Sequence, residues 1–497
     1  MINKMRVCLI NPPRIHPKVW GQPTVYQPLS IAYVAAVLEK QHKVSIIDAP
    51  TEGWRHTEDI DETNSKVGLT NKQIAQKIKQ ISPDVAGVSI PFSGWSKAAF
   101  EVASVIKDVD KNITTILDGL HPSARPAECL ANPNVDFVVR GEPEYSTLEL
   151  VNDLEKGATN EELKKIQGIG FTEKQKPVIT TPRPEIQDLD ALPFPARHLL
   201  PMERYFEAVK ENPIRGVIRD HYAIMITSRG CPHKCIFCSN NIVMGKKWRG
   251  RNPESVVDEI EHLVKTYKIK QIDFFDDNMT RVKKRAEKIC DLIVERNLNI
   301  NWFVPTGVRA DTIDEQLLRK MKGSGCRGVR FAPESGVQRV VTDIIGKNLK
   351  LEDVEKAVIL AKKVGIKTAI FFILGLPGET KADMEQTIKF AYKLRKLGAE
   401  KFHFSIATPI YGTELYRQAV EGGFLTDGFS DDALARAEPL METPEFTTEE
   451  LREICIRANA INQNITAAKV FKLIKNPKQA MVIAKALLTK PKHKKNP

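Results

Sequence analysis

Three of the chain's eight cysteines, Cys231, Cys235 and Cys238, stand in the stretch Ser228–Asn241, here called the cysteine loop. Thiolates at this C-x3-C-x2-C spacing repel one another unless a cation neutralises them, so the spacing indicates a metal centre. A structural zinc site needs four ligands, and the nearest fourth candidate, His233, lies between two cysteines, where it is poorly placed. A [4Fe–4S] cluster held by three cysteines leaves one iron open. The spacing therefore favours such a cluster over zinc.

The elements that must hold this loop follow from the pattern of apolar residues. After Tyr222, runs rich in apolar residues alternate with amphipathic helical segments, which predicts β/α units and a parallel sheet. The strands are expected at 223–230, 269–277, 300–311, 327–336, 367–380 and 401–409. These units fit a (β/α)6-type partial TIM barrel, in which the chemistry lies at the carboxyl ends of the strands. The cysteine loop follows the first strand.

The rest of the chain divides around this barrel. Residues 1–150 alternate strand and helix patterns and predict an α/β, doubly wound, Rossmann-like (flavodoxin-like) domain with a ligand crevice at its strand ends. No G-x-G-x-x-G follows the first strand, so a nicotinamide dinucleotide is not expected there. Residues 151–217, rich in proline, are expected to form an ordered linker. The barrel is expected at 218–420 and a helical C-terminal region at 421–497.

The cysteine loop carries a resemblance to a known family. The pattern C-x3-C-x-aromatic-C, with Phe237 as the aromatic residue, directly after the first strand of a β/α barrel, resembles the radical S-adenosylmethionine (SAM) enzymes. The resemblance covers about residues 220–410. It implies that SAM binds the open iron through its amino and carboxylate groups and that one electron, from a donor such as ferredoxin or flavodoxin, cleaves SAM to a 5′-deoxyadenosyl radical.

The same resemblance implies contacts to SAM from residues at the strand ends. The acidic side chains and Asn278 are expected to accept hydrogen bonds from its ammonium or ribose, and the arginine to pair with a carboxylate. The two glycines and the backbone of the aromatic residue are expected to lie against adenine. The alternatives are an internal ion pair for the arginine and a simple turn for the glycines. These candidates are Phe237, Asp276, Asp277, Arg309, Glu334, Gly375 and Gly378.

The first domain followed by this barrel resembles the cobalamin (B12)-binding radical SAM group. The matching stretches include NPP at Asn11–Pro13, DGLHPS at Asp118–Ser123 and VDFVVRGEPE at Val135–Glu144. Asp118 replaces a glycine of the usual Gly-Gly-x-His loop, and the D-x-H-x-x-G signature for a histidine ligand to cobalt is absent, so the lower cobalt ligand stays open. The resemblance implies cobalamin contacts at the strand ends. Those candidates are Ser89, Gly119, His121, Gly141 and Glu142.

The resemblance implies methylation of an unactivated carbon, with a lipid or isoprenoid as one candidate substrate. The group that it matches also includes the anaerobic magnesium-protoporphyrin ester cyclase, hopanoid methylases and archaeal lipid ring synthases, so oxidative ring formation stays an alternative. A second alternative, of another class, is a sensor or binding protein that holds a cluster and a corrinoid without turnover. A methylthiotransferase acting on tRNA is disfavoured because Cys8 and Cys129 stand alone and the C-terminal end reads as helical.

The charge of the chain is concentrated at its end. Of a net charge of +12, nine lysines without any acidic residue lie between Asn464 and Pro497, so the remainder is nearly balanced, which argues against a nucleic-acid partner. This tail predicts basic amphipathic helices that either lie on an anionic membrane surface or cap the barrel. The scattered remaining cysteines and the absence of long apolar runs predict a cytoplasmic protein, with peripheral membrane contact through the tail as an option.

Overall fold

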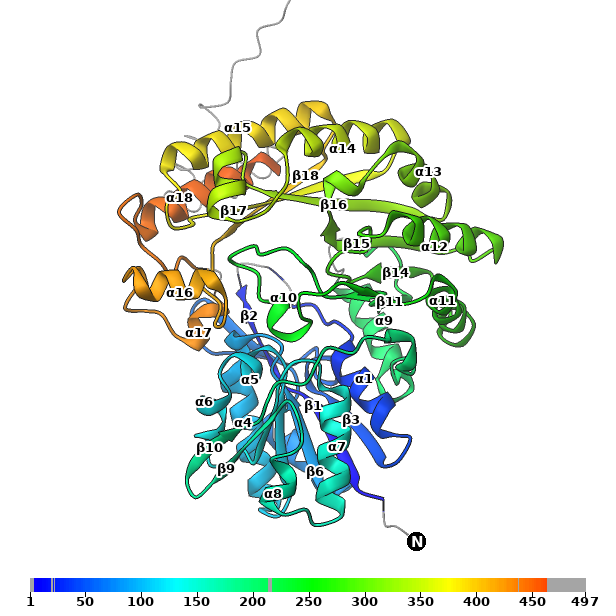
Figure 1. Ribbon diagram of the computed structural model, residues 1–497, viewed down its shortest axis with the longest axis vertical. Coiled ribbons are helices and arrows are strands. Elements are labelled where there is room, and N and C mark those ends of the chain that lie inside the picture. Colours follow the sequence, from blue (N-terminus) through cyan, green and yellow to red (C-terminus); the bar gives the residue numbers. More distant parts are fainter. Residues whose placement is uncertain (1–3, 19–20, 22, 213–216, 437, 463–497) are drawn as a thin grey trace, which may run out of the picture.

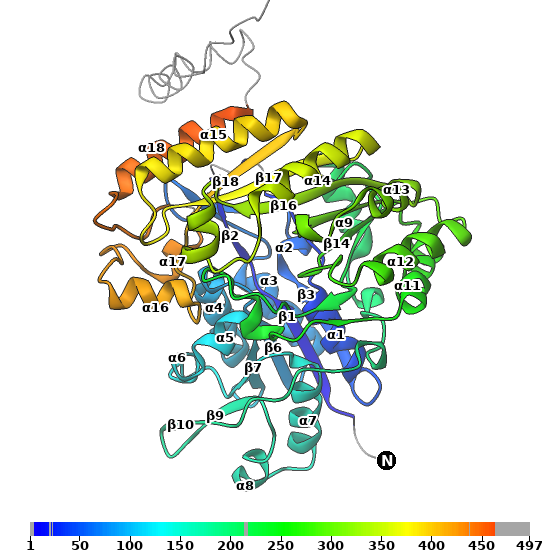
Figure 2. The same ribbon diagram turned by 45° about the horizontal axis from the view of Figure 1, so that its top comes forward.

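The structure, a computed structural model, describes residues 4–18, 21, 23–212, 217–436 and 438–462. It contains two large sheets, one in the lower and one in the upper half of Figure 1, with the cysteine loop between them (Figures 1 and 2). The predicted α/β class is therefore confirmed, with a first unit built on one sheet and a second built on the other.

The first sheet confirms the predicted doubly wound domain. Its parallel strands are buried apolar runs, as five successive buried residues in Val7–Asn11 show. Its strands, in spatial order, are β10 (Lys176–Ile179), β9 (Ile169–Glu173), β8 (Phe137–Val139), β7 (Thr114–Asp118), β6 (Val85–Ser89), β1 (Arg6–Asn11) and β3 (Lys43–Asp48).

Helices cover both faces of this sheet, and α1 (Leu29–Leu38) is buried almost all round, whereas α3 (Asn71–Ile81) buries one apolar side. In α3, Thr70 and Gln73 form a capping box, and Ile74 and Ile78 are the buried residues. The other helices are α2 (Ala49–Glu52), α4 (Ser96–Val109), α5 (Leu120–Ala124), α6 (Pro126–Leu130), α7 (Pro143–Glu155), α8 (Asn160–Leu163) and α9 (Met202–Glu211). A small antiparallel sheet adds β2 (Arg14–Pro17), β4 (Thr57–Asp59) and β5 (Asn64–Val67).

The segment 151–217 differs from the expected linker. β9 and β10 form an antiparallel hairpin that pairs with β8 and extends the first sheet to Ile179. The two residues of the turn, Lys174 and Gln175, both have a positive φ, of 49° and 62°. Two-residue hairpins of this kind usually carry Asn-Gly, and the sequence lacks that signal. The expected domain boundaries stay a prediction, with the first sheet reaching past residue 150.

The second sheet confirms the predicted partial barrel. It holds six parallel strands, where a complete TIM barrel has eight. The strands, in spatial order, are β11 (Tyr222–Met225), β14 (Gln271–Phe274), β15 (Asn301–Val308), β16 (Cys326–Glu334), β17 (Lys367–Leu374) and β18 (Lys401–Ile406). The helices are α11 (Pro253–Tyr267), α12 (Lys283–Glu295), α13 (Glu315–Gly323), α14 (Leu351–Val364) and α15 (Lys381–Leu397).

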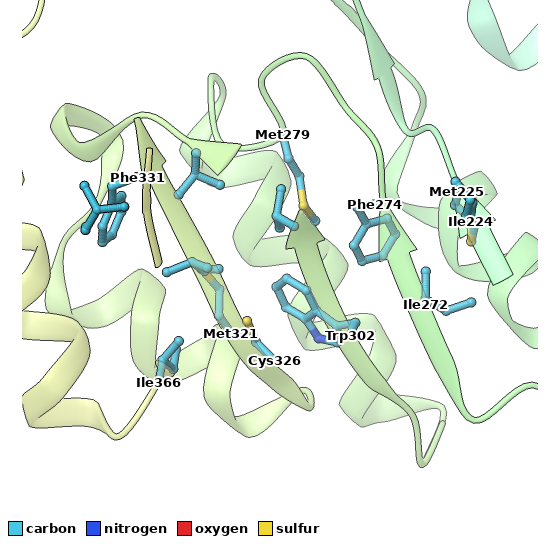
Figure 3. Close-up of a cluster of buried hydrophobic side chains, with 14 of the residues drawn as sticks. Ile224, Met225, Ile272, Phe274, Met279, Trp302, Met321, Cys326, Phe331 and Ile366 are labelled. Atoms are coloured by element: carbon cyan, nitrogen blue, oxygen red, sulfur yellow. The ribbon is translucent and has the colours of Figure 1, made fainter. Parts of the chain in front are cut away.

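The barrel helices lie on the outer face of the sheet (Figures 1 and 2). The core on this side includes Phe274, Trp302 and Phe331, all fully buried (Figure 3). The indole Nε1 of Trp302 donates a hydrogen bond of 3.1 Å to the carbonyl oxygen of Ser324, so its polar group is satisfied inside the core. The packed outer face leaves the inner face of the sheet for other contacts.

The C-terminal region is helical up to the last described residue. It comprises α16 (Glu414–Glu421), α17 (Asp431–Leu434) and α18 (Thr448–Asn459). Two asparagines cover the outer edge of β18: Asn459 bonds the backbone N–H and carbonyl of Phe404, and Asn462 does the same with Phe402. The basic tail lies outside the described residues. Among the described helices, none is both long and apolar enough to cross a bilayer.

Candidate functional site

The cysteine loop is framed by two short strands. β12 (Ser228–Arg229) pairs with β13 (Arg249–Gly250) in antiparallel fashion, and α10 (Asn240–Val243) lies between them in sequence. Gly230 has a φ of +82°, and a Cβ there would lie 2.2 Å from the carbonyl oxygen of Lys247. Only glycine fits this position, so the chain makes its sharp turn one residue before Cys231.

The loop is anchored at one buried residue among its thiols. Ile236 packs into an apolar cluster at the carboxyl ends of the strands, and its neighbours Cys235 and Phe237 are partly buried there. The N–H of Ile236 donates to Ile345 over 3.0 Å, and its carbonyl accepts from Leu415 over 2.8 Å. The loops after β16 and β18 therefore hold the cysteine loop in place. The predicted convergence of the strand ends is what the structure shows here.

The acidic residues after β14 position the loop. Asp276, fully buried, accepts hydrogen bonds from the backbone and hydroxyl of Thr227 and from the hydroxyl of Ser228. Asp277 accepts from the Gly230 N–H over 2.9 Å and from the Asn240 side chain over 2.6 Å. Burial raises the pKa of Asp277 to about 6. The carboxylates of both residues thus have partners within the protein, and their expected contact with SAM stays a prediction.

The neighbouring Asn278 differs from the two aspartates. Its side chain is 1% exposed, and neither its Oδ1 nor its Nδ2 has a hydrogen-bond partner among the described residues. Its carbonyl oxygen accepts from Trp248 Nε1 over 3.0 Å, which fixes the backbone after β14. A buried amide with both polar atoms unpaired is costly. Asn278 is thus the residue of this group best suited to accept a polar ligand.

The thiols themselves require a cation to ionise. Burial raises the pKa of Cys235 and, to about 11, that of Cys238, so without a metal both would be protonated at neutral pH. The positive charge of Lys347 opposes this shift at Cys235. Metal binding to these sulfurs would therefore release protons, as at other thiolate sites.

The donor set of the cysteine loop favours a cluster over a single ion. Cys231, Cys235 and Cys238 are all partly exposed, so their thiols are accessible to a metal. A structural zinc site is closed by four ligands, whereas three cysteines on a [4Fe–4S] cluster leave one iron open. Among the described residues, a group of three ligand atoms within 4.8 Å of one another occurs elsewhere, at His121, Glu128 and Asp431.

The end of β16 supplies a strained acidic residue. Glu334 has a φ of +69°, unusual for a residue with a side chain, and its carboxylate pairs with Lys347 Nζ over 2.7 Å. Burial raises the pKa of Glu334, and the positive charge of Lys347 opposes that rise. Both groups influence the pKa of Cys235. Glu334 was predicted from the sequence as a site residue, whereas Lys347 was not. Lys347 simply follows the stretch VVTDIIG, and nothing in that stretch indicates a partner for Glu334.

Arg309, like Glu334 and Lys347, lies close enough to the cysteine loop for its charge to influence the pKa of Cys235. It donates to Asp311 over 2.9 and 2.6 Å and to the carbonyl oxygen of Asn348, so the internal ion pair left open by the sequence is present. Its Nη1 is buried and has no hydrogen-bond partner among the described residues. Burial lowers the pKa of His233 in the cysteine loop, and the positive charge of Arg309 lowers it further. Arg309 thus faces the loop with one donor left for a further acceptor.

The two glycines after β17 have different surroundings. A Cβ on Gly375, whose φ is +89°, would lie 2.4 Å from Cδ2 of Leu451 in α18, so glycine is required there by close packing. A Cβ on Gly378 would lie 3.6 Å from Ile344, which is ordinary contact. The expected contact of both glycines with adenine stays a prediction. Glu379, which the sequence analysis did not single out, accepts from the N–H groups of Gly375 and Leu376 over 2.7 and 3.1 Å.

Glu379 gives a prediction for the pH dependence of stability. It is fully buried, and burial raises its pKa to about 7. The folded state therefore holds a proton that the unfolded chain releases near pH 4.5, so this stabilisation is complete below pH ~4.5 and is lost as the pH rises through ~7. We expect wild type to lose stability relative to Glu379→Gln, by up to roughly 3 kcal/mol, between pH 4.5 and 8. Urea unfolding of both proteins across this range checks the expectation, and a pH-independent difference would contradict it.

In the first domain, the candidate residues at the strand ends have different surroundings. A Cβ on Gly141, at a φ of +74°, would meet no described atom within 4 Å, so this position borders open space. A Cβ on Gly119 would lie 2.6 Å from the carbonyl oxygen of Ile90, so this glycine is required by close packing. Ser89 is buried, and its hydrogen bond opposes the rise in the pKa of Asp118, which burial brings to about 6.

His121 does not face open space. It is fully buried beneath the C-terminal region, with its Nε2 3.9 Å from Asp431 Oδ2 and its ring at the edge of Tyr411. Asp431 also accepts hydrogen bonds from the hydroxyls of Tyr411 and Ser96 over 2.7 and 2.6 Å. Burial lowers the pKa of His121 and favours the neutral ring. Its contacts join the first domain to α17.

Glu142 belongs to a buried set of ion pairs. Its carboxylate pairs with Arg229 over 2.9 Å and with Arg249 over 2.7 Å, and Arg229 also pairs with Glu144 over 2.6 Å. These four side chains, here called the arginine–glutamate network, are at most 4% exposed. Because Arg229 and Arg249 belong to β12 and β13, the network fixes the frame of the cysteine loop to the first domain. The expected contact of Glu142 with a cofactor stays a prediction.

Comparison with known proteins gives separate matches for the first domain and for the barrel. Residues 225–391 match the model of the radical SAM superfamily, and residues 23–151 match that of the B12 binding domain. An uncharacterized methyltransferase of Pyrococcus horikoshii is 35% identical over 91% of both chains. A cytidylyl-2-hydroxyethylphosphonate methyltransferase of Streptomyces wedmorensis is 30% identical over 88% of this chain and 86% of its own. An anaerobic magnesium-protoporphyrin IX monomethyl ester cyclase of Rubrivivax gelatinosus is 30% identical over 75% and 66%.

Solved structures share the whole architecture. The cobalamin-dependent SAM radical enzyme OxsB, with aqua-cobalamin and SAM bound, superposes with a TM-score of 0.71 at 18% identity and covers 98% of this chain and 71% of its own. The radical SAM methyltransferase TsrM of Kitasatospora setae gives a TM-score of 0.67 at 16% identity over 97% and 99%. With the two matched domains and relatives that cover nearly its full length, this chain belongs to the cobalamin (B12)-binding radical SAM family.

Proposed function

We propose that the chain is a radical SAM methyltransferase that methylates an unactivated carbon. One observation carries the proposal: three partly exposed thiols stand on one loop that packs at the carboxyl ends of the barrel strands. Cys231, Cys235 and Cys238 would hold a [4Fe–4S] cluster through three of its irons. Relatives described as methyltransferases that cover most of the chain support methyl transfer.

The protein's own residues would bind and orient two further cofactors. SAM would lie between the cysteine loop and the end of β16, where Asn278, Glu334 and Arg309 offer polar atoms. A cobalamin would lie at the carboxyl edge of the first sheet, beside the open space at Gly141. When bound, the cluster supplies the electron that cleaves SAM, and the cobalamin supplies the methyl group. The arginine–glutamate network would hold the two sites at a fixed separation.

The proposal extends to the substrate, the electron donor and a second candidate reaction. A lipid or isoprenoid substrate and peripheral membrane contact are suggested by the nine lysines of the tail, which lies outside the described residues. An electron donor such as ferredoxin or flavodoxin is required because cleavage of SAM consumes an electron. Ring formation is the second candidate function, which the relative in Rubrivivax gelatinosus favours.

Product analysis under strictly anaerobic conditions tests the proposal. The full-length protein is reconstituted with iron, sulfide and hydroxocobalamin, then mixed with SAM and dithionite. We expect close to four irons per chain and release of 5′-deoxyadenosine. A protein that binds iron and cobalamin but never releases 5′-deoxyadenosine would be a sensor rather than an enzyme. A protein that retains only zinc would overturn the proposed site itself.

A further inference from the structure

A cavity of about 890 Å³ lies against the inner face of the second sheet. It is lined by side chains from β14 to β18, and it reaches from Glu334, at the carboxyl end of β16, to Lys367 and Lys401, at the amino ends of β17 and β18. We call it the barrel groove. Its size is in the usual range for small-molecule sites. Apart from Glu334, the residues that line the groove have no role in the site described at the cysteine loop or in the first domain.

The barrel groove is long and changes in character along its length. Arg330 and Glu334 are four residues apart on β16, which corresponds to roughly 13 Å at the rise of a strand. Between these levels the lining includes the apolar side chains of Ala332, Phe371 and Ile373, and the polar residues His403 and Ser405 lie beside the last two on β18. A ligand that reaches from one level to the other would therefore lie against a mainly apolar wall.

Arg330 is held rigidly at the middle of the barrel groove. Its Nη1 donates to the carbonyl oxygen of Pro305 over 2.7 Å, and its guanidinium carbon lies 5.0 Å above the ring of Phe371. Asp273 lines the same cavity on the other side; burial raises the pKa of this carboxyl to about 6, and the charge of Arg330 opposes the rise. A guanidinium positioned by its neighbours loses little side-chain entropy when it binds an anion.

The charges of the barrel groove are predominantly positive. Its lining has five lysines and arginines against three acidic residues. One of those acids, Glu334, already pairs with Lys347. The positive side chains are Lys322, Arg327, Arg330, Lys367 and Lys401. The half of the groove that lies away from the cysteine loop thus carries an excess of positive charge, whereas the half near the loop does not.

From these observations we infer that the barrel groove binds an elongated substrate with an apolar chain and an anionic end group, and that Arg330 contacts this end group. The inference rests on the proposed function, because the cysteine loop at the Glu334 end decides which end of the substrate reacts. The anionic group, a carboxylate or a phosphate, would lie against Arg330, and the carbon to be methylated would lie beside Glu334.

Binding of simple alkyl probes tests this inference without turnover. Octyl phosphate, octanoate and octanol share one chain length, which suits the distance between Arg330 and Glu334, and they differ in the end group. Isothermal titration of the reconstituted full-length protein is expected to show both anions binding at least about 10-fold more tightly than octanol, because hydrogen bonds to charged groups contribute about 1.5–3 kcal/mol. The relative affinity of the two anions distinguishes a carboxylate from a phosphate substrate.

Two substitutions of Arg330 separate a specific contact from attraction to the basic tail. Arg330→Gln is expected to weaken both anions about 10- to 100-fold and to leave octanol unchanged, which also shows that the groove is intact. Arg330→Lys keeps the positive charge but lacks the planar guanidinium, so its affinity for the anions should fall less than that of Arg330→Gln. Arg319→Gln, which removes an exposed arginine of α13, is the matched control and should change nothing.

Two results would overturn the inference. One is an equal affinity of the wild-type protein for octanol and the anions. The other is an anion preference that Arg330→Gln and Arg330→Lys leave unchanged. Release of 5′-deoxyadenosine is measured on the same preparations. If SAM is cleaved while the anion preference is absent, only this inference fails. If the anions bind as expected while SAM is never cleaved, the proposed function fails instead.

Discussion

Replacing Cys231, Cys235 and Cys238 together by alanine should abolish both iron binding and the release of 5′-deoxyadenosine. The three thiols are the only cysteines of the described chain that share one loop, and burial keeps at least two of them protonated unless a cation is present. Removing them removes every sulfur ligand from the site. Iron and acid-labile sulfide should fall to background, and the product should be undetectable by chromatography.

Cysteines outside the loop provide the control. Cys290 lies buried in α12, and Cys455 lies in α18, where its thiol donates to the carbonyl oxygen of Phe404 over 3.4 Å. Cys290→Ala and Cys455→Ala should each retain the full iron content and activity. If the triple variant kept its iron, or if the wild-type protein took up zinc alone, the cluster assignment would be wrong.

The parallel strands could be predicted because buried strands consist of nearly continuous runs of apolar residues. β1 is an almost continuous apolar run, and the long strands β16 and β17 each begin after a glycine that ends or follows a helix. The cysteine loop could be predicted for a similar reason, since the spacing of its ligands is local. Sequence alone also placed the loops that follow the strands at one end of the barrel, because parallel strands share their carboxyl edge.

The contacts of the individual side chains could not be predicted in this way. Arg249 and Glu142 are 107 residues apart in the chain, and nothing in either segment specifies the other as a partner. His121 was expected at a cofactor and is covered by α17, which lies more than 300 residues later. The positive φ of Glu334 has no signal in the stretch APESG. Each of these features depends on how the two domains and the C-terminal helices pack.

The arginine–glutamate network should make the largest measurable contribution to stability. Glu142→Ala leaves Arg249 buried without its carboxylate and also removes the acceptor of the Ile186 N–H, which donates over 2.7 Å. Breaking a buried ion pair by removing one partner costs about 3–5 kcal/mol. We expect a loss of this size in urea unfolding. Since Arg249 borders the cysteine loop, we also expect the cluster of this variant to be lost more readily to a chelator.

A surface pair gives the matched comparison. Glu149 pairs with Arg183, and its side chain is 46% exposed, so solvent already screens that interaction. Glu149→Ala should therefore cost no more than about 1 kcal/mol. Both substitutions remove a glutamate that pairs with an arginine. The two positions are also close in the chain, because Glu142 directly precedes α7 and Glu149 lies within it. A similar loss for the two variants would show that burial of the network contributes nothing.

A double-mutant cycle decides whether the charges in this network depend on each other. Arg249→Met alone leaves Glu142 with Arg229 as its only arginine partner, and Glu142→Ala alone leaves Arg249 unpaired. The double variant removes both charges together, so it should be more stable than the sum of the two losses predicts, by about 1–3 kcal/mol. Additive losses would mean that the two residues stabilise the domain contact independently. In that case the network would not act as a unit, and the cysteine loop would be held mainly by Asp276, Asp277 and the backbone hydrogen bonds of Ile236.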